Sequence, residues 1–264
     1  MRRFFIIGAA AVAMWTTAGS AQNLPWNNPG GQTTAPATSA PAPKRDINGI
    51  WDAGGGGIGA RGMQTSPLTP AGDALGKTHH SGDGARMVPA DQINDPLSTM
   101  GDPGGFPRML LFELRPFEAV QMPNKVLMFY MFEKRWRVIW TDGRALPNNP
   151  DPRWYGYSVG RWEDDDTFVV NTIGSDERTW LDNAGNPHSA DLKVEERYHR
   201  VNRDLMELTV TIDDPKTYTR TWTPRNRMPL TLAPAGFDMM EMICSPTEVM
   251  EFRKNISDRS NTAR

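Results

Sequence analysis

Apolar and polar residues alternate over much of the chain between residues 46 and 244, and this period-two pattern predicts β-strands. The β signal is strong at 117–122, 125–132 and 135–140, where the turn dipeptide Pro123-Asn124 separates the first two stretches. The stretch 125–132 is apolar on both faces, as expected for a strand that is buried on both sides. Further strands are predicted at 46–52, twice within 154–174, and at 193–201, 205–212, 216–223 and 238–244. About nine or ten antiparallel strands with short links indicate an all-β fold, either an up-and-down barrel or a curled sandwich.

The hairpin at 154–174 decides which side chains of two strands face the interior. If Asp164 and Asp165 form a two-residue turn, Arg161 falls on the same face as Tyr155 and Tyr157. A guanidinium does not lose its proton, so an inward-facing Arg161 needs a carboxylate, a carbonyl or an anionic ligand. This register predicts a hollow with Arg161 facing into it.

A second hairpin, at 193–212, sets ionisable residues beside an apolar strand. A turn at Asn202-Arg203 places three ionisable residues on the apolar face, namely Glu195, Arg197 and His199. A slip of the strand pairing by one residue would put Glu196 and Tyr198 on that face instead. The sequence leaves both registers open.

The N-terminal 21 residues have the character of a signal peptide. Arg2 and Arg3 precede a short apolar run that ends in small residues, which favours cleavage after Ala21. The apolar run is too short for a stable membrane span. We therefore expect an exported protein, periplasmic or secreted, without stable insertion into a membrane.

The rest of the chain divides by composition. Residues 22–44 are rich in Pro and Ala and are predicted to form a disordered linker. Residues 45–254 are predicted to form a single β-barrel-like domain, interrupted by a long loop-rich insertion near residues 54–108. Residues 255–264 are predicted to be a flexible tail.

The net charge and the cysteine and histidine content argue against a nucleic-acid surface, an internal disulfide and a metal site. The formal net charge is −2, and loss of Arg2 and Arg3 with the signal makes it −4, which argues against a surface for nucleic acid. The single cysteine, Cys244, cannot form an internal disulfide, and we interpret it as a small buried hydrophobe. The adjacent pair His79-His80 lacks the spacing of zinc ligands, and no metal or other cofactor is expected.

Aromatic and ionisable residues near the predicted interior are the candidates for a site. Apolar walls with a few convergent polar groups are typical of a cavity for a small molecule. The candidate ligand-binding residues are Trp136, Trp140, Tyr155, Tyr157, Arg161, Arg197, Tyr198, His199 and Trp222. The candidate catalytic residues are His188 or His199 as a base, Glu195 or Glu196 as an acid, and Arg161 to stabilise an oxyanion.

Several short motifs make the chain similar to a large group of exported bacterial β-rich proteins of unassigned function. The matching pieces are Gly49-Ile50-Trp51, Asp142-Gly143-Arg144, Gly160-Arg161-Trp162-Glu163, Asp166-Thr167-Phe168-Val169-Val170, Glu196-Arg197-Tyr198, Asp213-Asp214-Pro215 and Tyr218-Thr219-Arg220 with Trp222. Gly49-Ile50-Trp51 also resembles the G-x-W on the first strand of lipocalin-type barrels, which implies a lipocalin-like fold. Asp165 stands where a glycine is common in the group. The resemblance implies no particular reaction.

Three functions are open at this point. The first is a barrel that binds a small apolar or aromatic molecule in an internal cavity. The second is a cofactor-free enzyme, a lyase, isomerase or hydrolase, that uses the same cavity for a hydrophobic or sugar-derived substrate. The third is an interaction module of the cell envelope, with the Pro/Ala linker as its spacer.

Overall fold

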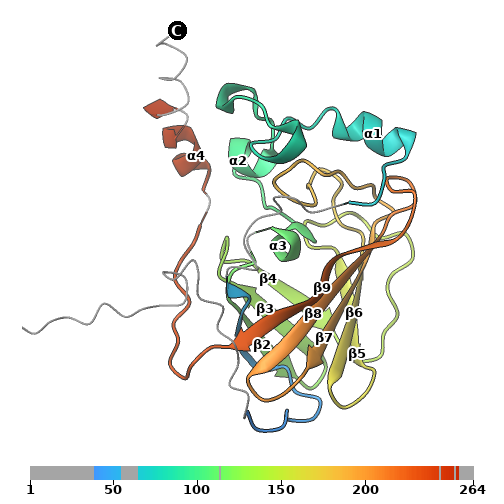
Figure 1. The fold of residues 1–264 in the computed structure, drawn as a ribbon, viewed down its shortest axis with the longest axis vertical. Helices are drawn as coiled ribbons and strands as arrows, with labels where there is room; N and C mark the ends of the chain where they lie inside the picture. Colours follow the sequence, from blue (N-terminus) through green and yellow to red (C-terminus); the bar gives the residue numbers. More distant parts are fainter. Residues whose placement is uncertain (1–38, 55–64, 113, 244, 253, 256–264) are drawn as a thin grey trace, which may run out of the picture.

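The computed structural model describes residues 39–54, 65–112, 114–243, 245–252 and 254–255, and within them nine strands close into a barrel (Figure 1). The strands are β1 (Gly49–Asp52), β2 (Phe117–Met122), β3 (Lys125–Tyr130), β4 (Trp136–Trp140), β5 (Tyr157–Trp162), β6 (Thr167–Ile173), β7 (Lys193–Arg200), β8 (Leu205–Asp213) and β9 (Trp222–Leu232). They follow one another around the barrel in chain order, and β9 closes it by pairing with β1. The predicted all-β barrel is confirmed.

The strands β4 and β5 are parallel, unlike the other neighbouring pairs of the barrel. The cause is parity, because strands that alternate in direction around a closed ring cannot all be antiparallel when their number is odd. The parallel ladder is also short, since it pairs only Ile139 with Ser158 and Trp140 with Val159. Parallel strands need a crossover connection, and residues 141–156 provide it.

The loop-rich insertion between β1 and β2 carries short helices that gather at one end of the barrel (Figure 1). They are α1 (Pro70–Gly76), η3 (Gly84–Arg86), η4 (Ala90–Gln92), α2 (Pro96–Met100) and α3 (Arg108–Leu111), and a last helix, α4 (Pro246–Phe252), follows the barrel. Thr69 caps α1, because its hydroxyl accepts a hydrogen bond from the N–H of Gly72. A buried ion pair joins the insertion internally, with the Arg108 guanidinium 2.7 and 2.8 Å from the two carboxylate oxygens of Asp95.

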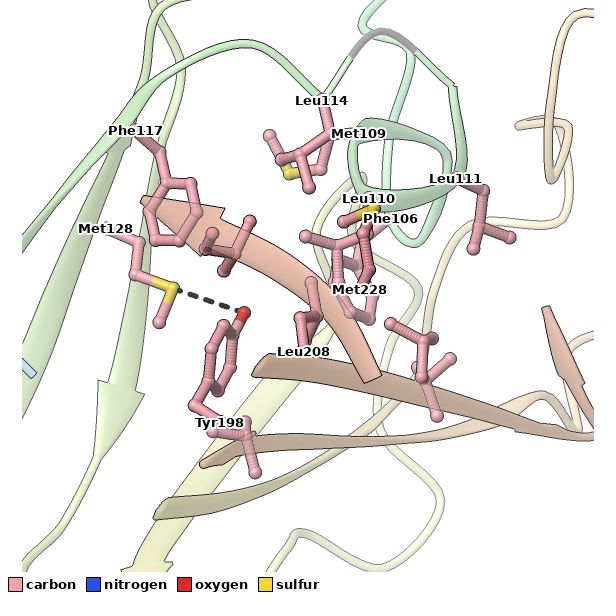
Figure 2. Close-up of a cluster of buried hydrophobic side chains, with 14 of the residues drawn as sticks. Phe106, Met109, Leu110, Leu111, Leu114, Phe117, Met128, Tyr198, Leu208 and Met228 are labelled. Atoms are coloured by element: carbon pink, nitrogen blue, oxygen red, sulfur yellow. Dashed lines mark hydrogen bonds between the residues drawn. The ribbon is translucent and has the colours of Figure 1, made fainter. Parts of the chain in front are cut away.

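Apolar side chains from residues 106–111, which include α3, and from Leu114 fill one end of the barrel. Figure 2 shows them directed toward side chains from the strands, among them Phe117, Tyr198 and Leu208. The members of this plug are Phe106, Met109, Leu110, Leu111 and Leu114, and all are buried. Each such side chain contributes about 1.5–3 kcal/mol by leaving water. The barrel is packed at this end, so the predicted hollow does not extend through it.

The hairpin between β5 and β6 has a three-residue turn, residues 164–166, instead of the predicted two, because the N–H of Glu163 donates to the carbonyl of Thr167 at 3.0 Å. Trp162 pairs with Phe168, and the carboxylate of Asp164 accepts hydrogen bonds from the N–H groups of Asp166 and Thr167 at 2.8 and 2.6 Å. These Asx-type hydrogen bonds stabilise the longer turn. The strand pairing is therefore shifted by one residue, and the side chains of β5 change face while Phe168 and Val170 of β6 stay in the core. Arg161 is exposed on the outside of the barrel, so the prediction that it faces inward is wrong.

The hairpin between β7 and β8 follows the same rule. Arg200 pairs with Met206, and the N–H of Val201 donates to the carbonyl of Leu205 at 3.0 Å, so residues 202–204 form a three-residue turn. The side-chain oxygen of Asn202 accepts from the N–H of Asp204 at 2.9 Å. Glu196 and Tyr198 consequently face the interior and are fully buried. The sequence left two registers open, and the structure has the one that places Glu196 and Tyr198, rather than Glu195, Arg197 and His199, in the interior.

The predictions of strands at 216–223 and 238–244 are wrong. The chain forms β9 at residues 222–232 rather than strands at 216–223 and 238–244, and in the described part of 238–244 Met242 makes an isolated bridge to Phe132. The strand β9 contains Pro224 and Pro229, and proline is uncommon inside a strand. The pairing of β9 with β8 shifts register twice, and Arg227 has a φ of +51° there. Such irregularities admit proline into a sheet.

Several predictions fall on residues outside the described ranges. These are the signal peptide at 1–21, most of the linker at 22–44, Cys244 and most of the tail at 255–264. None of the helices within the described ranges combines the length and the apolar character needed to span a membrane.

Candidate functional site

A pocket of about 460 Å³ opens on the outside of the barrel at the seam between β4 and β5. Residues 136–138 and 140 line one side, residues 155–159 line the other, and residues 144–147 with 153 from the crossover form the outer wall. The two strands pair over only two residues, so their other ends stand apart and leave space between them. We call this space the wedge pocket.

Four aromatic side chains meet in the wedge pocket, namely Trp136, Trp140, Tyr155 and Tyr157. The inward positions of β4 are taken by Arg137 and Ile139, which turns both tryptophans outward. Trp136 keeps 58% of its surface exposed. The sequence named these four residues together as the lining of an internal cavity, but Trp136, Trp140 and Tyr157 face away from the barrel interior, and Tyr155 packs partly against the core.

Two arginines stack on the aromatic rings of the wedge pocket. The guanidinium carbon of Arg144 lies 3.7 Å from the ring centre of Trp140, and that of Arg153 lies 4.0 Å from the ring centre of Tyr157. Cation–π contacts at exposed sites contribute about 0.5–1 kcal/mol each. Asp142 also binds Arg144, with a shortest distance of 2.6 Å between nitrogen and oxygen. These contacts hold the rings and the cations together as one surface.

A buried carboxylate lies behind Tyr155. The Tyr155 hydroxyl donates to Glu133 at 3.4 Å, and the N–H of Gly104 donates to both carboxylate oxygens of Glu133 at 3.2 Å. Burial raises the pKa of Glu133 and, together with the Glu133 charge, raises the pKa of Tyr155. Tyr155 therefore faces the pocket as a neutral aromatic ring whose polar tip is already bonded.

The strongest polar contact inside the barrel is the ion pair between Arg137 and Glu196. Arg137 Nη2 lies 2.7 Å from Glu196 Oε1, Nη1 lies 3.1 Å from Oε2, and both side chains are almost wholly buried. The Tyr198 hydroxyl donates to the same carboxylate at 2.7 Å. Phe106 from the plug covers the guanidinium, with its ring centre 4.1 Å from the Arg137 carbon.

Other polar side chains complete this interior cluster. Arg137 Nη2 donates to the hydroxyls of Ser158 at 3.2 Å and Thr172 at 3.5 Å. Burial opposes the charge of Arg137, but the Glu196 carboxylate outweighs it and raises the pKa of Arg137. Burial also raises the pKa of Tyr130 to about 12. The guanidinium and the carboxylate neutralise each other, so the cluster has a structural role, although the buried Nε of Arg137 has no hydrogen-bond partner among the described residues.

The remaining outward-facing candidates lie in a shallow polar groove on the barrel surface or beside it. Arg197 forms ion pairs with Glu163 and Glu195, and His199 Nδ1 lies 3.2 Å from the Thr167 hydroxyl. Exposed ion pairs of this kind contribute about 0.2–1 kcal/mol. Glu195, Arg197, His199 and Arg161 all belong to the outer face, so the prediction that they line an interior is wrong.

The buried candidates have structural roles. Trp222 packs on Tyr218 with ring centres 5.3 Å apart, and Tyr198 is part of the interior cluster. His188 is completely buried in the loop after β6, where its Nε2 lies 2.8 Å from the Thr179 hydroxyl and its Nδ1 lies 3.1 Å from the Ser189 carbonyl. The candidate catalytic residues His188, Glu195, Glu196 and Arg161 are thus in three different environments and form no common site.

The buried His188 predicts acid sensitivity. Burial lowers its pKa from the ordinary 6.5, so the unfolded chain takes up a proton at a higher pH than the folded one. The free energy of unfolding should therefore fall as the pH drops below 6.5. We expect His188→Gln to reduce that pH dependence in urea unfolding between about pH 7.5 and about pH 5.5, while the exposed His199→Gln leaves it unchanged. An unchanged slope in His188→Gln would contradict this assignment.

The sequence pointed to the aromatic residues of the wedge pocket but not to its arginines. Arg144 was visible within the Asp142-Gly143-Arg144 turn motif, and Arg137 within a strand, but nothing in either pattern showed that they lie near one pocket. Arg153 follows a proline-rich loop and carried no signal. Only the position of the crossover at the seam brings them together.

In the described ranges, no group of three or more His, Cys, Asp or Glu side chains is arranged to hold a metal ion. Comparison of the chain with protein-family models, with curated proteins and with solved structures finds no significant match. The arguments for function therefore depend on the geometry of the chain itself.

Proposed function

We propose that this protein binds a small, flat, apolar or aromatic molecule in the wedge pocket. One observation carries the proposal, which is the convergence of four aromatic side chains on one pocket with Trp136 left 58% exposed. Aromatic rings offer large apolar faces and stack well on other flat groups. Pockets for small molecules have volumes of about 300–1,000 Å³, and the wedge pocket, at 460 Å³, falls within this range.

The polar groups at the inner end of the pocket support binding more than catalysis. Arg137 is held by Glu196, and the Ser158 hydroxyl lies 2.9 Å from that of Thr172. Groups already engaged in a buried network are poor donors of a proton or a nucleophile to a ligand. A cofactor-free enzyme and an envelope interaction module stay as alternative predictions.

The proposed setting is outside the cytoplasm. Export, cleavage after Ala21 and a periplasmic or secreted location are inferred from the signal-like sequence at 1–21. Native mass spectrometry of the mature protein isolated from its own host would reveal a ligand that co-purifies with it.

Trp136→Ala is expected to weaken binding of a flat aromatic probe about tenfold, because it removes an apolar stacking face from the pocket mouth. The probes are 2-naphthamide and 2-naphthoate, and the measurement is isothermal titration calorimetry. Stability should change by less than about 0.5 kcal/mol, since the side chain is largely exposed. Met87→Ala, at a residue 67% exposed and outside the pocket, is the control. If Trp136→Ala bound each probe as tightly as the wild-type protein does, the proposed site would be contradicted.

A further inference from the structure

We propose that the wedge pocket selects an aromatic molecule with one negative charge, such as an aromatic carboxylate, and that Arg153 recognises the charge. This inference rests on the proposed function, because it assigns the ligand class of the same pocket. It follows from the charges around the pocket and from which of them already have partners.

The lining of the wedge pocket is positively charged. Among the described residues it includes the three arginines Arg137, Arg144 and Arg153 and no aspartate or glutamate. The whole chain has a formal net charge of −2, so this composition is opposite in sign to the protein average. A cleft lined by one sign of charge raises the local concentration of ligands of the other sign.

Two of the three arginines are already neutralised. Arg137 forms the buried pair with Glu196, with Nη2 and Oε1 2.7 Å apart. Arg144 is bound by Asp142, whose two oxygens lie 2.9 and 3.0 Å from Arg144 Nε and one of which lies 2.6 Å from Nη2. The charge of each of these two guanidinium groups is therefore balanced by a carboxylate of the protein.

Arg153 differs from both. Its side chain is exposed, and within the described part of the chain no carboxylate forms an ion pair with it. Its guanidinium stacks on Tyr157 at 4.0 Å, which positions the group without using up its in-plane N–H donors. Those donors match the two oxygens of a carboxylate. One aromatic wall beside one unneutralised arginine therefore fits an aromatic monoanion.

Three acidic residues from segments around the pocket are already bound by other groups. Glu133 lies behind Tyr155, where the N–H of Gly104 and the Tyr155 hydroxyl bind it, and burial raises its pKa. Asp176 is paired with Arg178 at 2.6 Å. Asp142 is committed to Arg144. The charge of Arg153 is left for the ligand.

The test compares three probes of the same shape, the anion 2-naphthoate, the neutral 2-naphthamide and the cation 2-naphthylmethylammonium. We expect wild-type protein to bind the anion about tenfold more tightly than the amide in titration calorimetry at low salt. The ammonium compound should bind most weakly. Added salt should reduce the advantage of the anion, because Arg153 is exposed.

Variants of Arg153 assign the charge recognition to that residue. Arg153→Gln should bring the affinity for 2-naphthoate down to that for 2-naphthamide, and Arg153→Lys should retain part of the preference. The matched control is Arg161→Gln, at an exposed arginine on the outer face of β5 that does not line the pocket, and its preference should equal that of wild type.

The outcomes separate this inference from the proposed function. If anion and amide bind equally well and both depend on Trp136, the pocket exists but its charge selectivity is overturned. The inference is also overturned if Arg153→Gln keeps the preference for the anion. If no probe of the three binds wild-type protein, both the pocket and its selectivity are overturned.

Discussion

Replacing Glu196 with alanine is expected to lower the free energy of unfolding by about 3–5 kcal/mol. The reason is that the Arg137 guanidinium, whose side chain is only 2% exposed, would then be left charged and unpaired inside the barrel. The Tyr198 hydroxyl would lose its acceptor at the same time. Urea unfolding followed by circular dichroism measures the change, and failure of the variant to fold would agree with the expectation.

The control is the adjacent residue. Glu195→Ala removes an outward-facing carboxylate whose side chain is 39% exposed, so the loss should stay within about 0.5 kcal/mol. The double replacement Arg137→Met with Glu196→Leu removes both charges, and it should be much more stable than Glu196→Ala alone because no buried charge is left unpaired. If Glu195→Ala were as damaging as Glu196→Ala, the register of β7 described above would be wrong.

The class of fold could be predicted because alternation of side chains is a local property. In β8 the burial alternates at every position from Leu205 to Asp213, and the same period is visible in the sequence. The plug could not be predicted in this way. The short segment at 106–114 has no period that distinguishes a core-filling turn of helix from a surface loop, and its partners are strands far away in the sequence.

The inner face was mispredicted for the β5–β6 hairpin and left open for the β7–β8 hairpin, for one physical reason. The side chains of Asp164 and Asn202 accept hydrogen bonds from backbone N–H groups at the turns, and each turn has three residues instead of two. A change in turn length that shifts the pairing by one residue exchanges inside and outside for a whole strand. Arg161 was therefore assigned to the interior when the interior of β5 is occupied by Ser158, Gly160 and Trp162. Phe168 packs where a Cβ on Gly160 would lie, which leaves no room for a larger side chain.

The location of the candidate site depends on topology, which strand patterns do not contain. The wedge pocket exists because an odd number of strands forces one parallel pair, and β4 and β5 are that pair. The sequence showed that aromatic residues gather at 136–140 and 154–157, but it did not show which two strands would be parallel. The residue types could be read from the sequence, and their position outside the wall could not.

The plug makes a second strong prediction. Phe106→Ala is expected to lower the free energy of unfolding by about 3–5 kcal/mol, because it deletes a completely buried ring from the packed end of the barrel. Met100→Ala, in the same insertion but at a side chain 61% exposed, should change stability by less than about 0.5 kcal/mol. Urea unfolding measures both. A small effect of Phe106→Ala would mean that the plug does not fill the barrel.

Phe106 and the interior ion pair should also depend on each other. The Phe106 ring lies 4.1 Å from the Arg137 guanidinium and keeps water away from it. When the ring is removed, water can reach the guanidinium, so losing Glu196 as well should cost less than it does in the intact barrel. The double variant Phe106→Ala with Glu196→Ala should therefore be more stable than the sum of the two single losses predicts, by about 0.5–3 kcal/mol. Strict additivity would show that the plug and the ion pair are independent, in conflict with their contact in the structure.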